Sequence, residues 1–87
     1  MSEVQVSPLV HVRLTLFADL KRFLPKGEYG PLAFELGSGA TVRTLLAQAG
    51  IPAVEEITVG LNGTQGDRDS ILRDGDEVVL FSPMEGG

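Results

Sequence analysis

The sequence offers few side chains of the kinds that perform chemistry. Among its 87 residues there is no cysteine and only one histidine, His11. The absence of cysteine excludes disulfides, thiolate-bound zinc, cysteine-ligated iron–sulfur clusters and a cysteine nucleophile. His11 alternates with apolar residues in a strand-like stretch. We therefore interpret it as a surface residue, not as a general base or a metal ligand.

Two further patterns could suggest a binding site, and each has a simpler explanation. Four aspartates occur close together, at positions 67, 69, 74 and 76. Their spacing is not that of a calcium-binding loop, and each has a turn or capping role available. Gly60, Gly63 and Gly66 surround a predicted hairpin and do not open a helix, so they do not form a phosphate-binding loop. We expect no metal and no bound cofactor.

The remaining candidate is the segment 83–87, which ends in Gly86-Gly87. The segment lacks the sequence patterns of a helix or a strand, and we therefore expect it to form an extended tail. Glycine lacks a Cβ, so a diglycine can pass through a narrow channel and leave a terminal carboxylate open to reaction with the α-phosphate of ATP. We expect Gly87 to carry the reactive group and Gly86 to be the residue that must fit the channel. The alternative is an incidental or engineered end.

Alternation of apolar residues and turn signals predict the strands that position this tail. The five predicted strands cover residues 10–16, 32–36, 57–61, 64–67 and 77–82. Asn62-Gly63 is the sequence most typical of a two-residue hairpin. Asp74-Gly75-Asp76 predicts a tight turn into the last strand.

Two helices are predicted between these strands. A short helix over Ala18–Leu24 is stopped by Pro25. A longer helix is capped by Thr41 and runs through Ala49, with Gly50 as its left-handed end. Its apolar stripe consists of Val42, Leu45, Leu46 and Ala49.

The same periodicities divide the apolar residues into a core and a second face. The predicted core contains Val12, Leu14, Leu45, Leu46, Val59, Val78 and Leu80. A capped turn over Asp69–Leu72 is expected to bury both Ile71 and Leu72. Val79 and Phe81 have the opposite parity in the last strand and predict an exposed apolar patch beside the tail.

This order of elements predicts an α+β fold of the β-grasp (ubiquitin-like) type, a mixed roll packed on one main helix. The first and last strands should be central and parallel, because the elements between them supply the long crossover that parallel pairing requires. A chain of 87 residues has room for one domain. We place it at residues 10–82, after an N-terminal extension of residues 1–9 and before the tail of residues 83–87.

Charge is unevenly distributed along the chain. The net charge is -5, with +1 over residues 1–54 and -6 over residues 55–87. This balance argues against binding to nucleic acid. The acidic part suits a basic partner surface, or is simply a solvated face. No apolar run is long enough to span a membrane and no signal peptide is apparent, so we expect a cytoplasmic protein.

Several motifs together resemble the MoaD/ThiS family of ubiquitin-like sulfur carriers. They are Phe17-Ala18-Asp19-Leu20, Gly39-Ala40-Thr41-Val42 with Leu45-Leu46, Asn62-Gly63, and the segments 72–78 and 81–87. The resemblance covers nearly the whole chain from about Val10. Its most specific part is the Asp-Gly-Asp-Glu-Val turn, followed by Phe-x-Pro and Gly-Gly in that order.

This resemblance implies a carrier and co-substrate, not an autonomous enzyme. Gly87 would be adenylated by an E1-like adenylyltransferase of the MoeB/ThiF type and converted to a thiocarboxylate by a sulfur donor enzyme. The acceptor would be a molybdopterin synthase large subunit or another acceptor enzyme. The partner contacts are expected from Val79, Phe81, Pro83 and Met84.

The resemblance divides between two subfamilies. The helix after Phe17 resembles the molybdopterin synthase small subunit, whereas the brief connection from Gly50 to Ile57 is closer to the thiamin carriers. Ser82 stands where the molybdopterin form usually has a proline. We prefer molybdenum cofactor biosynthesis over thiamin as the pathway. Two other functions stay open: a ubiquitin-like modifier joined to lysines through Gly87, and an interaction module with an incidental diglycine.

Overall fold

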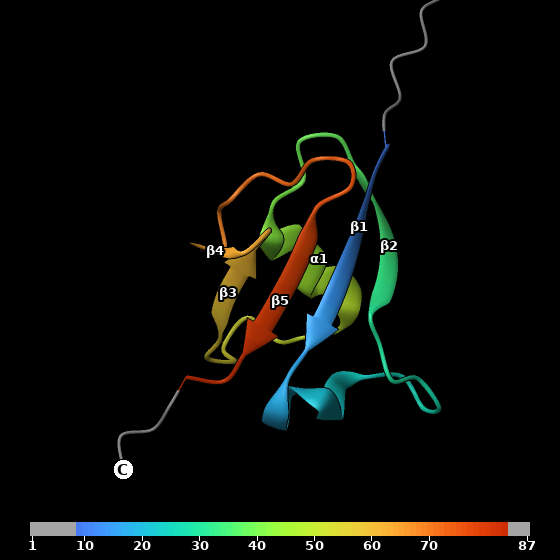
Figure 1. The fold of residues 1–87 in the computed structure, drawn as a ribbon, viewed down its shortest axis with the longest axis vertical. Coiled ribbons are helices and arrows are strands. Elements are labelled where there is room, and N and C mark those ends of the chain that lie inside the picture. The colour runs from blue at the N-terminus through green and yellow to red at the C-terminus, as the bar shows by residue number, and fades with distance from the viewer. Residues whose placement is uncertain (1–8, 84–87) are drawn as a thin grey trace, which may run out of the picture.

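In the part of the chain that the structure describes, five strands form one mixed sheet, and one α-helix lies across one of its faces (Figure 1). The computed structural model describes residues 9–83. The strands are β1 (Leu9–Leu16), β2 (Leu32–Gly37), β3 (Thr58–Leu61), β4 (Thr64–Gly66) and β5 (Glu77–Phe81). The helices are the 3-10 helix η1 (Ala18–Phe23) and the α-helix α1 (Val42–Ala49). This architecture confirms the predicted β-grasp roll.

The sheet is built around the parallel pair β1 and β5. The strand order is β2-β1-β5-β3-β4. Leu14 lies opposite Val78 and Leu16 opposite Leu80 in the parallel register, while β2 and β3 pair antiparallel on the two sides. The long connection between β1 and β5 contains α1. Such a crossover brings the chain back to the end of the sheet where β1 begins, so that β5 can run parallel to β1. The prediction of a central parallel pair is confirmed.

The core lies between the sheet and α1. All seven predicted core residues are buried. Leu20 and Leu72 also belong to this core, with exposed fractions of 0% and 1%. The prediction for Ile71 is wrong, because its exposed fraction is 61%. Ile71 forms an isolated antiparallel bridge with Thr41. In such an extended segment, neighbouring side chains point to opposite sides, so only Leu72 faces the core.

Helix α1 begins and ends as its sequence predicts. The Thr44 N–H donates to the Thr41 side chain at 3.4 Å, and the Thr41 N–H donates to the Thr44 side chain at 3.3 Å. This reciprocal pair satisfies two backbone donors that the helix itself leaves unpaired. Gly50 ends the helix with φ 80°, in the left-handed region that glycine adopts without strain.

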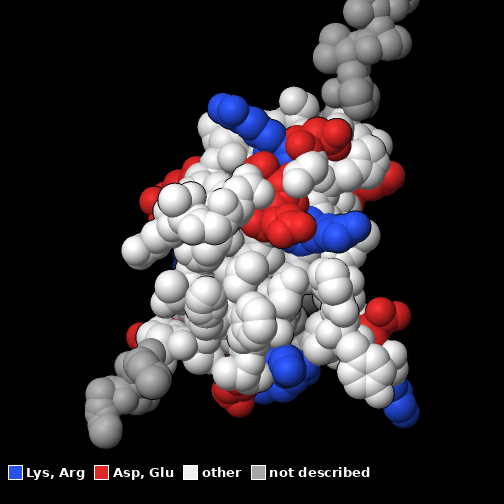
Figure 2. Space-filling model, in the orientation of Figure 1, with Lys and Arg blue, Asp and Glu red and all other residues white. Residues whose placement is uncertain are grey.

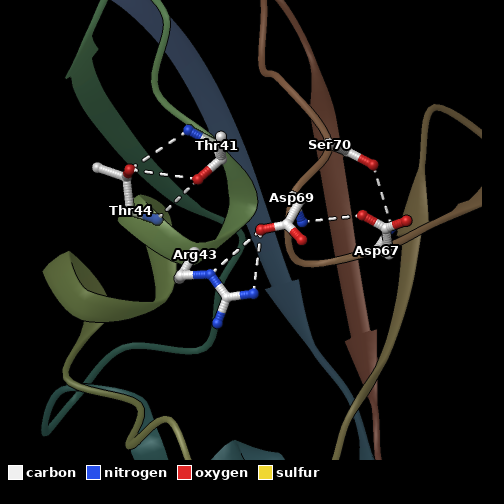
Figure 3. A network of polar contacts seen from close by, with 6 residues as sticks. All are labelled: Thr41, Arg43, Thr44, Asp67, Asp69 and Ser70. Carbon is white, nitrogen blue, oxygen red and sulfur yellow. Dashed lines mark hydrogen bonds and ion pairs between the residues drawn. The ribbon is translucent and has the colours of Figure 1, made fainter.

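The loop between β4 and the bridge at Ile71 holds the first turn of α1 (Figure 3). The Val42 N–H donates to the Ser70 carbonyl at 3.0 Å, and Arg43 reaches the Asp69 carboxylate at 3.0 Å. The loop is folded by Asp67, whose carboxylate accepts from the Asp69 N–H at 2.8 Å. The cap of this turn is therefore Asp67, two residues before the predicted start of the turn, because an Asx turn bonds the backbone two residues further on.

Several element boundaries differ from the prediction by one residue. The helix after Phe17 is a 3-10 helix that ends at Phe23, since the Leu20 N–H donates to Phe17 and the Leu24 N–H to Lys21, each three residues back. Strand β3 begins at Thr58, β4 ends at Gly66 and β5 ends at Phe81. At these edges the pairing partner ends, and alternation in the sequence does not reveal where a partner ends.

We expect Leu46→Ala to lower the free energy of unfolding by about 2 to 5 kcal/mol, because it opens a cavity under α1. Leu46 is 2% exposed. The measurement is urea denaturation of the two proteins. Ala47→Gly, on the same helix, is a useful comparison, because it changes helix propensity without removing a core side chain. A loss for Leu46→Ala no larger than for Ala47→Gly would contradict the packing described here.

Candidate functional site

The predicted reactive residues follow directly from the central strand of the sheet. Met84, Gly86 and Gly87 lie outside the described residues, and Pro83, the last described residue, is exposed. Two residues before Pro83, β5 ends at Phe81. Figure 1 shows the chain leaving β5 at the end of the sheet where η1 lies. The surface at this end is therefore the part of the body nearest to the tail.

The outer face of the sheet, opposite α1, carries two rows of side chains near this exit. In the first row Gly60 lies between Gln65 of β4 and Val79 of β5. In the second row Phe81 lies opposite Thr58 of β3. Phe17 follows the end of β1 on the other side, and its N–H donates to the Leu80 carbonyl at 3.0 Å. The parallel pair thus brings two aromatic residues together that are far apart in the sequence.

Phe81 and Val79 share this face as predicted, but they are half-buried, so the prediction of an exposed patch is wrong in degree. The Phe17 ring meets the Phe81 ring edge-on, with centroids 5.8 Å apart and an interplanar angle of 88°. Gly60 leaves space on the other side, where a Cβ would lie 3.8 Å from the Phe81 Cζ. The Phe81 ring is therefore covered by its neighbours, and Phe17, 46% exposed, presents more ring surface to solvent.

A shallow groove of about 310 Å³ lies beside these rings. Its walls and rim include Thr58, Gly60, Thr64, Gln65, Val79 and Phe81. The residues that line it in the described part of the chain carry no charge. A groove with apolar walls and a polar rim can bind an apolar side chain from another molecule.

Charge on the outer face separates along the strands. Arg13 of β1 lies opposite Glu77 of β5 in the strand register, in the row of this strand pair that is furthest from the tail exit. Figure 2 shows charged side chains gathered over the turn into β5, whereas the surface over the far half of β5 is uncharged and has a few charged side chains only at its lower border. A partner that approaches the tail would therefore meet an apolar surface with a charged border.

Sequence reasoning missed Phe17 and Gly60 as residues of this surface. Alternation along the strand could have placed Phe17 on the outer face, because Val12, Leu14 and Leu16 face the core. The same alternation places Gly60 on the outer face, because its neighbour Val59 is buried. What the sequence did not show is that strands β3 and β5 place Gly60 beside Val79.

His11 is an exposed residue that links two strands and a turn. Its Nδ1 lies 2.9 Å from Asp74 Oδ1, and its Nε2 lies 3.2 Å from Glu35 Oε2. The His11 N–H also donates to Asp74 Oδ1 at 2.7 Å. The hydrogen bonds that the His11 ring donates to Asp74 and Glu35 raise the pKa of His11, and the hydrogen bonds from the His11 backbone and ring lower the pKa of Asp74. This arrangement ties the turn into β5 to the central strand.

The other aspartates also have structural partners. Asp76 accepts a hydrogen bond from the Asn62 side chain at 2.8 Å and another from the Arg73 N–H, also at 2.8 Å. The Glu77 N–H donates to the Asn62 side-chain oxygen at 2.9 Å. Asn62 has φ 51°, as the predicted hairpin requires. The interpretation of the four aspartates as turn and loop residues is confirmed.

Within residues 9–83, no helix has the length and apolar character needed to span a membrane.

Comparison with known proteins gives a family match. The ThiS family model matches residues 14–87. No curated protein matches the chain. Among solved structures, small archaeal modifier protein 1 from Haloferax volcanii is similar to this chain, with 28% identity and a TM-score of 0.67 over 88% of this chain and 99% of its own.

Two further structures share the fold at lower identity. A putative molybdopterin converting factor, subunit 1, from Pyrococcus furiosus is 24% identical, with a TM-score of 0.68 over 86% of this chain and 99% of its own. A thiamine biosynthesis protein (ThiS) from Geobacter metallireducens is 23% identical, with a TM-score of 0.53 over the same two fractions, 86% and 99%.

The geometry around His11 predicts how stability depends on pH. Because folding raises the pKa of His11, its contribution is fully present below the ordinary histidine pKa of 6.5 and is lost as the pH rises through the folded value. We expect the urea midpoint to fall from about pH 6 to about pH 9, and to fall less in His11→Gln. The difference should be small, because the His11 and Asp74 side chains are 60% and 69% exposed and water screens the pair. The same pH dependence in both proteins would contradict this role of His11.

Proposed function

This chain belongs to the ThiS family, and on that basis we propose that it is a sulfur carrier whose reactive group is the α-carboxylate of Gly87. The observation that carries the proposal is the extent of the family match, which runs through residue 87 and so includes the diglycine. Members of this family are small carrier proteins that work with E1-like and acceptor enzymes. The chain would thus be a co-substrate whose chemistry is completed by its partners.

In this function a carboxylate oxygen of Gly87 attacks the α-phosphate of ATP within an E1-like adenylyltransferase, and pyrophosphate leaves. A sulfide-level nucleophile from the sulfur donor enzyme then adds to the acyl carbon, and AMP leaves to give the thiocarboxylate. Gly86 fits this role because it adds no side chain next to the reacting carbon. On the acceptor enzyme the thiocarboxylate sulfur finally bonds to a cofactor precursor, and water adds to the acyl carbon, so that the C–S bond breaks and the Gly87 carboxylate is restored.

The body of the protein supports this chemistry by presenting a rigid surface next to the tail. Val79 is fixed by sheet pairing on both sides, to Thr15 of β1 and to Gly60 of β3, and Phe81 is paired with Thr58 of β3. We assign to them, together with Pro83 and Met84, the contact with the activating enzyme and with the acceptor. Their uncharged surroundings suit a contact that excludes water near the adenylate.

For the pathway we propose molybdopterin formation. Two features support it: the presence of η1 after Phe17, and the shared fold with the putative molybdopterin converting factor subunit from Pyrococcus furiosus. A thiamin-type carrier is the alternative, which the family match itself and the short connection between α1 and β3 favour. Sulfur transfer from the purified thiocarboxylate to each acceptor system distinguishes the two pathways.

A protein modifier conjugated through Gly87 is a second candidate function. The similarity to small archaeal modifier protein 1 from Haloferax volcanii favours it. Both functions share the adenylation step, so the intact mass of the protein after incubation with ATP, activating enzyme and sulfur donor separates them. Replacement of one oxygen by sulfur supports the carrier. Covalent conjugates on lysines of other proteins support the modifier.

We expect deletion of Gly87, or addition of one alanine after it, to abolish ATP–pyrophosphate exchange with the E1-like enzyme. Each change moves the carboxylate by about 3.3 Å along the chain, whereas a misplacement of about 1 Å can already cost on the order of a hundredfold in rate. The urea midpoint should not change, because the tail lies beyond the core.

Glu85→Ala is the matched control, since it changes a tail side chain and keeps the length of the tail. It should retain exchange well above that of the Gly87 deletion. Normal exchange by the deletion variant would overturn both the carrier and the modifier functions and leave an interaction module.

A further inference from the structure

Gly60 leaves a gap in the row of side chains that crosses the outer face of the sheet. Its neighbours across the strands are Gln65 and Val79. Gly60 is the floor of the groove of about 310 Å³ described above, and the Phe81 ring forms one wall. We call the space over Gly60, between Gln65 and Val79, the Gly60 notch.

The fold itself does not require glycine at this position. The φ of Gly60 lies outside the left-handed region, so any residue could adopt its backbone conformation. A Cβ would lie 3.7 Å from the Val79 Cβ and 3.8 Å from the Phe81 Cζ, which are ordinary van der Waals distances. Glycine inside a strand is also less favourable than a residue with a side chain. The pairing of β3 with β4 and β5 is regular on both sides of Gly60, so a bulge does not explain the glycine, and a close approach by another molecule does.

We propose that the Gly60 notch receives one uncharged, apolar side chain of the enzyme that activates Gly87, and that Gly60 is a specificity-determining residue for this docking. The inference rests on the proposed function, because it takes Gly87 as the reactive residue. It adds to that function the site on the folded protein where the enzyme binds and the kind of enzyme side chain that binds there.

The length of the tail identifies the occupant. Four residues, 84–87, follow Pro83, and fully extended they span at most about 14 Å. An enzyme that holds the Gly87 carboxylate in its active site must therefore press against the surface nearest Pro83. Pro83 follows Phe81 by two residues, and the Phe81 ring borders the notch. During activation, the surface that the tail brings over Gly60 is thus that of the activating enzyme.

The lining of the notch determines which side chain fits. Val79 and Phe81 provide apolar walls, and Thr58, Thr64 and Gln65 provide an uncharged rim. A charged side chain would lose its water here without gaining an opposite charge, which is unfavourable. An aliphatic or aromatic side chain would displace water from apolar walls, and this stabilises the contact.

The test is steady-state ATP–pyrophosphate exchange with the E1-like enzyme, with this protein as the varied substrate. Gly60→Val fills the notch with a side chain that strands accept readily. We expect its KM to rise at least about tenfold with little change in kcat, as the loss of a central anchor contact would cause. Its urea midpoint should stay the same or rise. Gly60→Ala should show a smaller increase in KM.

Gly37→Val is the matched control. Gly37 is also a strand glycine with φ outside the left-handed region, it lies in β2, and no atom would come within 4 Å of its Cβ. We expect its KM to equal that of the wild type. The combination of unchanged or higher stability and weaker docking at Gly60 alone would not arise from a purely structural role of this glycine.

The outcomes separate this inference from the function on which it rests. No exchange by the wild type would overturn both. Normal exchange by the wild type together with an unchanged KM for Gly60→Val would overturn the notch and leave the carrier function standing. If Gly60→Val instead changed the self-association of the protein measured by light scattering, with KM unchanged, a second copy of this chain would be the occupant and the inference would be wrong.

Discussion

The parallel pairing of β1 with β5 at the centre of the sheet is the constraint on which the rest of the molecule depends. It buries Leu14, Leu16, Val78 and Leu80 together under α1. It also makes β5, the strand that leads to the tail, the middle strand of the sheet, with β1 on one side and β3 on the other. A tail that starts from such a strand begins at a fixed place. In the function proposed here, an enzyme that binds the folded body could therefore locate the Gly87 carboxylate.

The same pairing creates the surface beside the tail. Because the Phe17 N–H donates to the Leu80 carbonyl just after the end of β1, Phe17 lies next to Phe81, and the two rings meet edge-on. On the other side, the antiparallel pairing of β3 brings Gly60 next to Val79. The two aromatic rings and Gly60 thus lie on one face, and Gly60, Val79 and Phe81 line a groove without charged residues. Val79 and Phe81, the apolar residues of β5 on this face, are only half-buried by the rest of the protein.

Three of the eight acidic residues in the segment 55–87 shape turns. Asp67 folds the loop that holds α1, Asp74 binds His11, and Asp76 joins the Asn62 hairpin to the start of β5. These contacts are exposed, so each contributes little to the free energy of unfolding. Their value is geometric, since they fix the turns at the end of the sheet opposite the tail. The charge of this region therefore does not need a basic partner to explain it, although it borders the apolar face.

The sequence by itself determined which residues form the elements and which face the core, because period-two and helical spacing, Thr41, Gly50 and Asn62-Gly63 are local signals whose physics acts within a few residues. It also pointed to Gly86-Gly87 through motifs that resemble a family. Only the tertiary structure decided how faces combine: that Ile71 turns outward at its bridge with Thr41, that Phe81 is half-covered by Phe17, and that Gly60 opens a notch beside Val79. The physical reason is that exposure depends on neighbours brought from distant parts of the chain, and strand pairing, not sequence spacing, selects those neighbours.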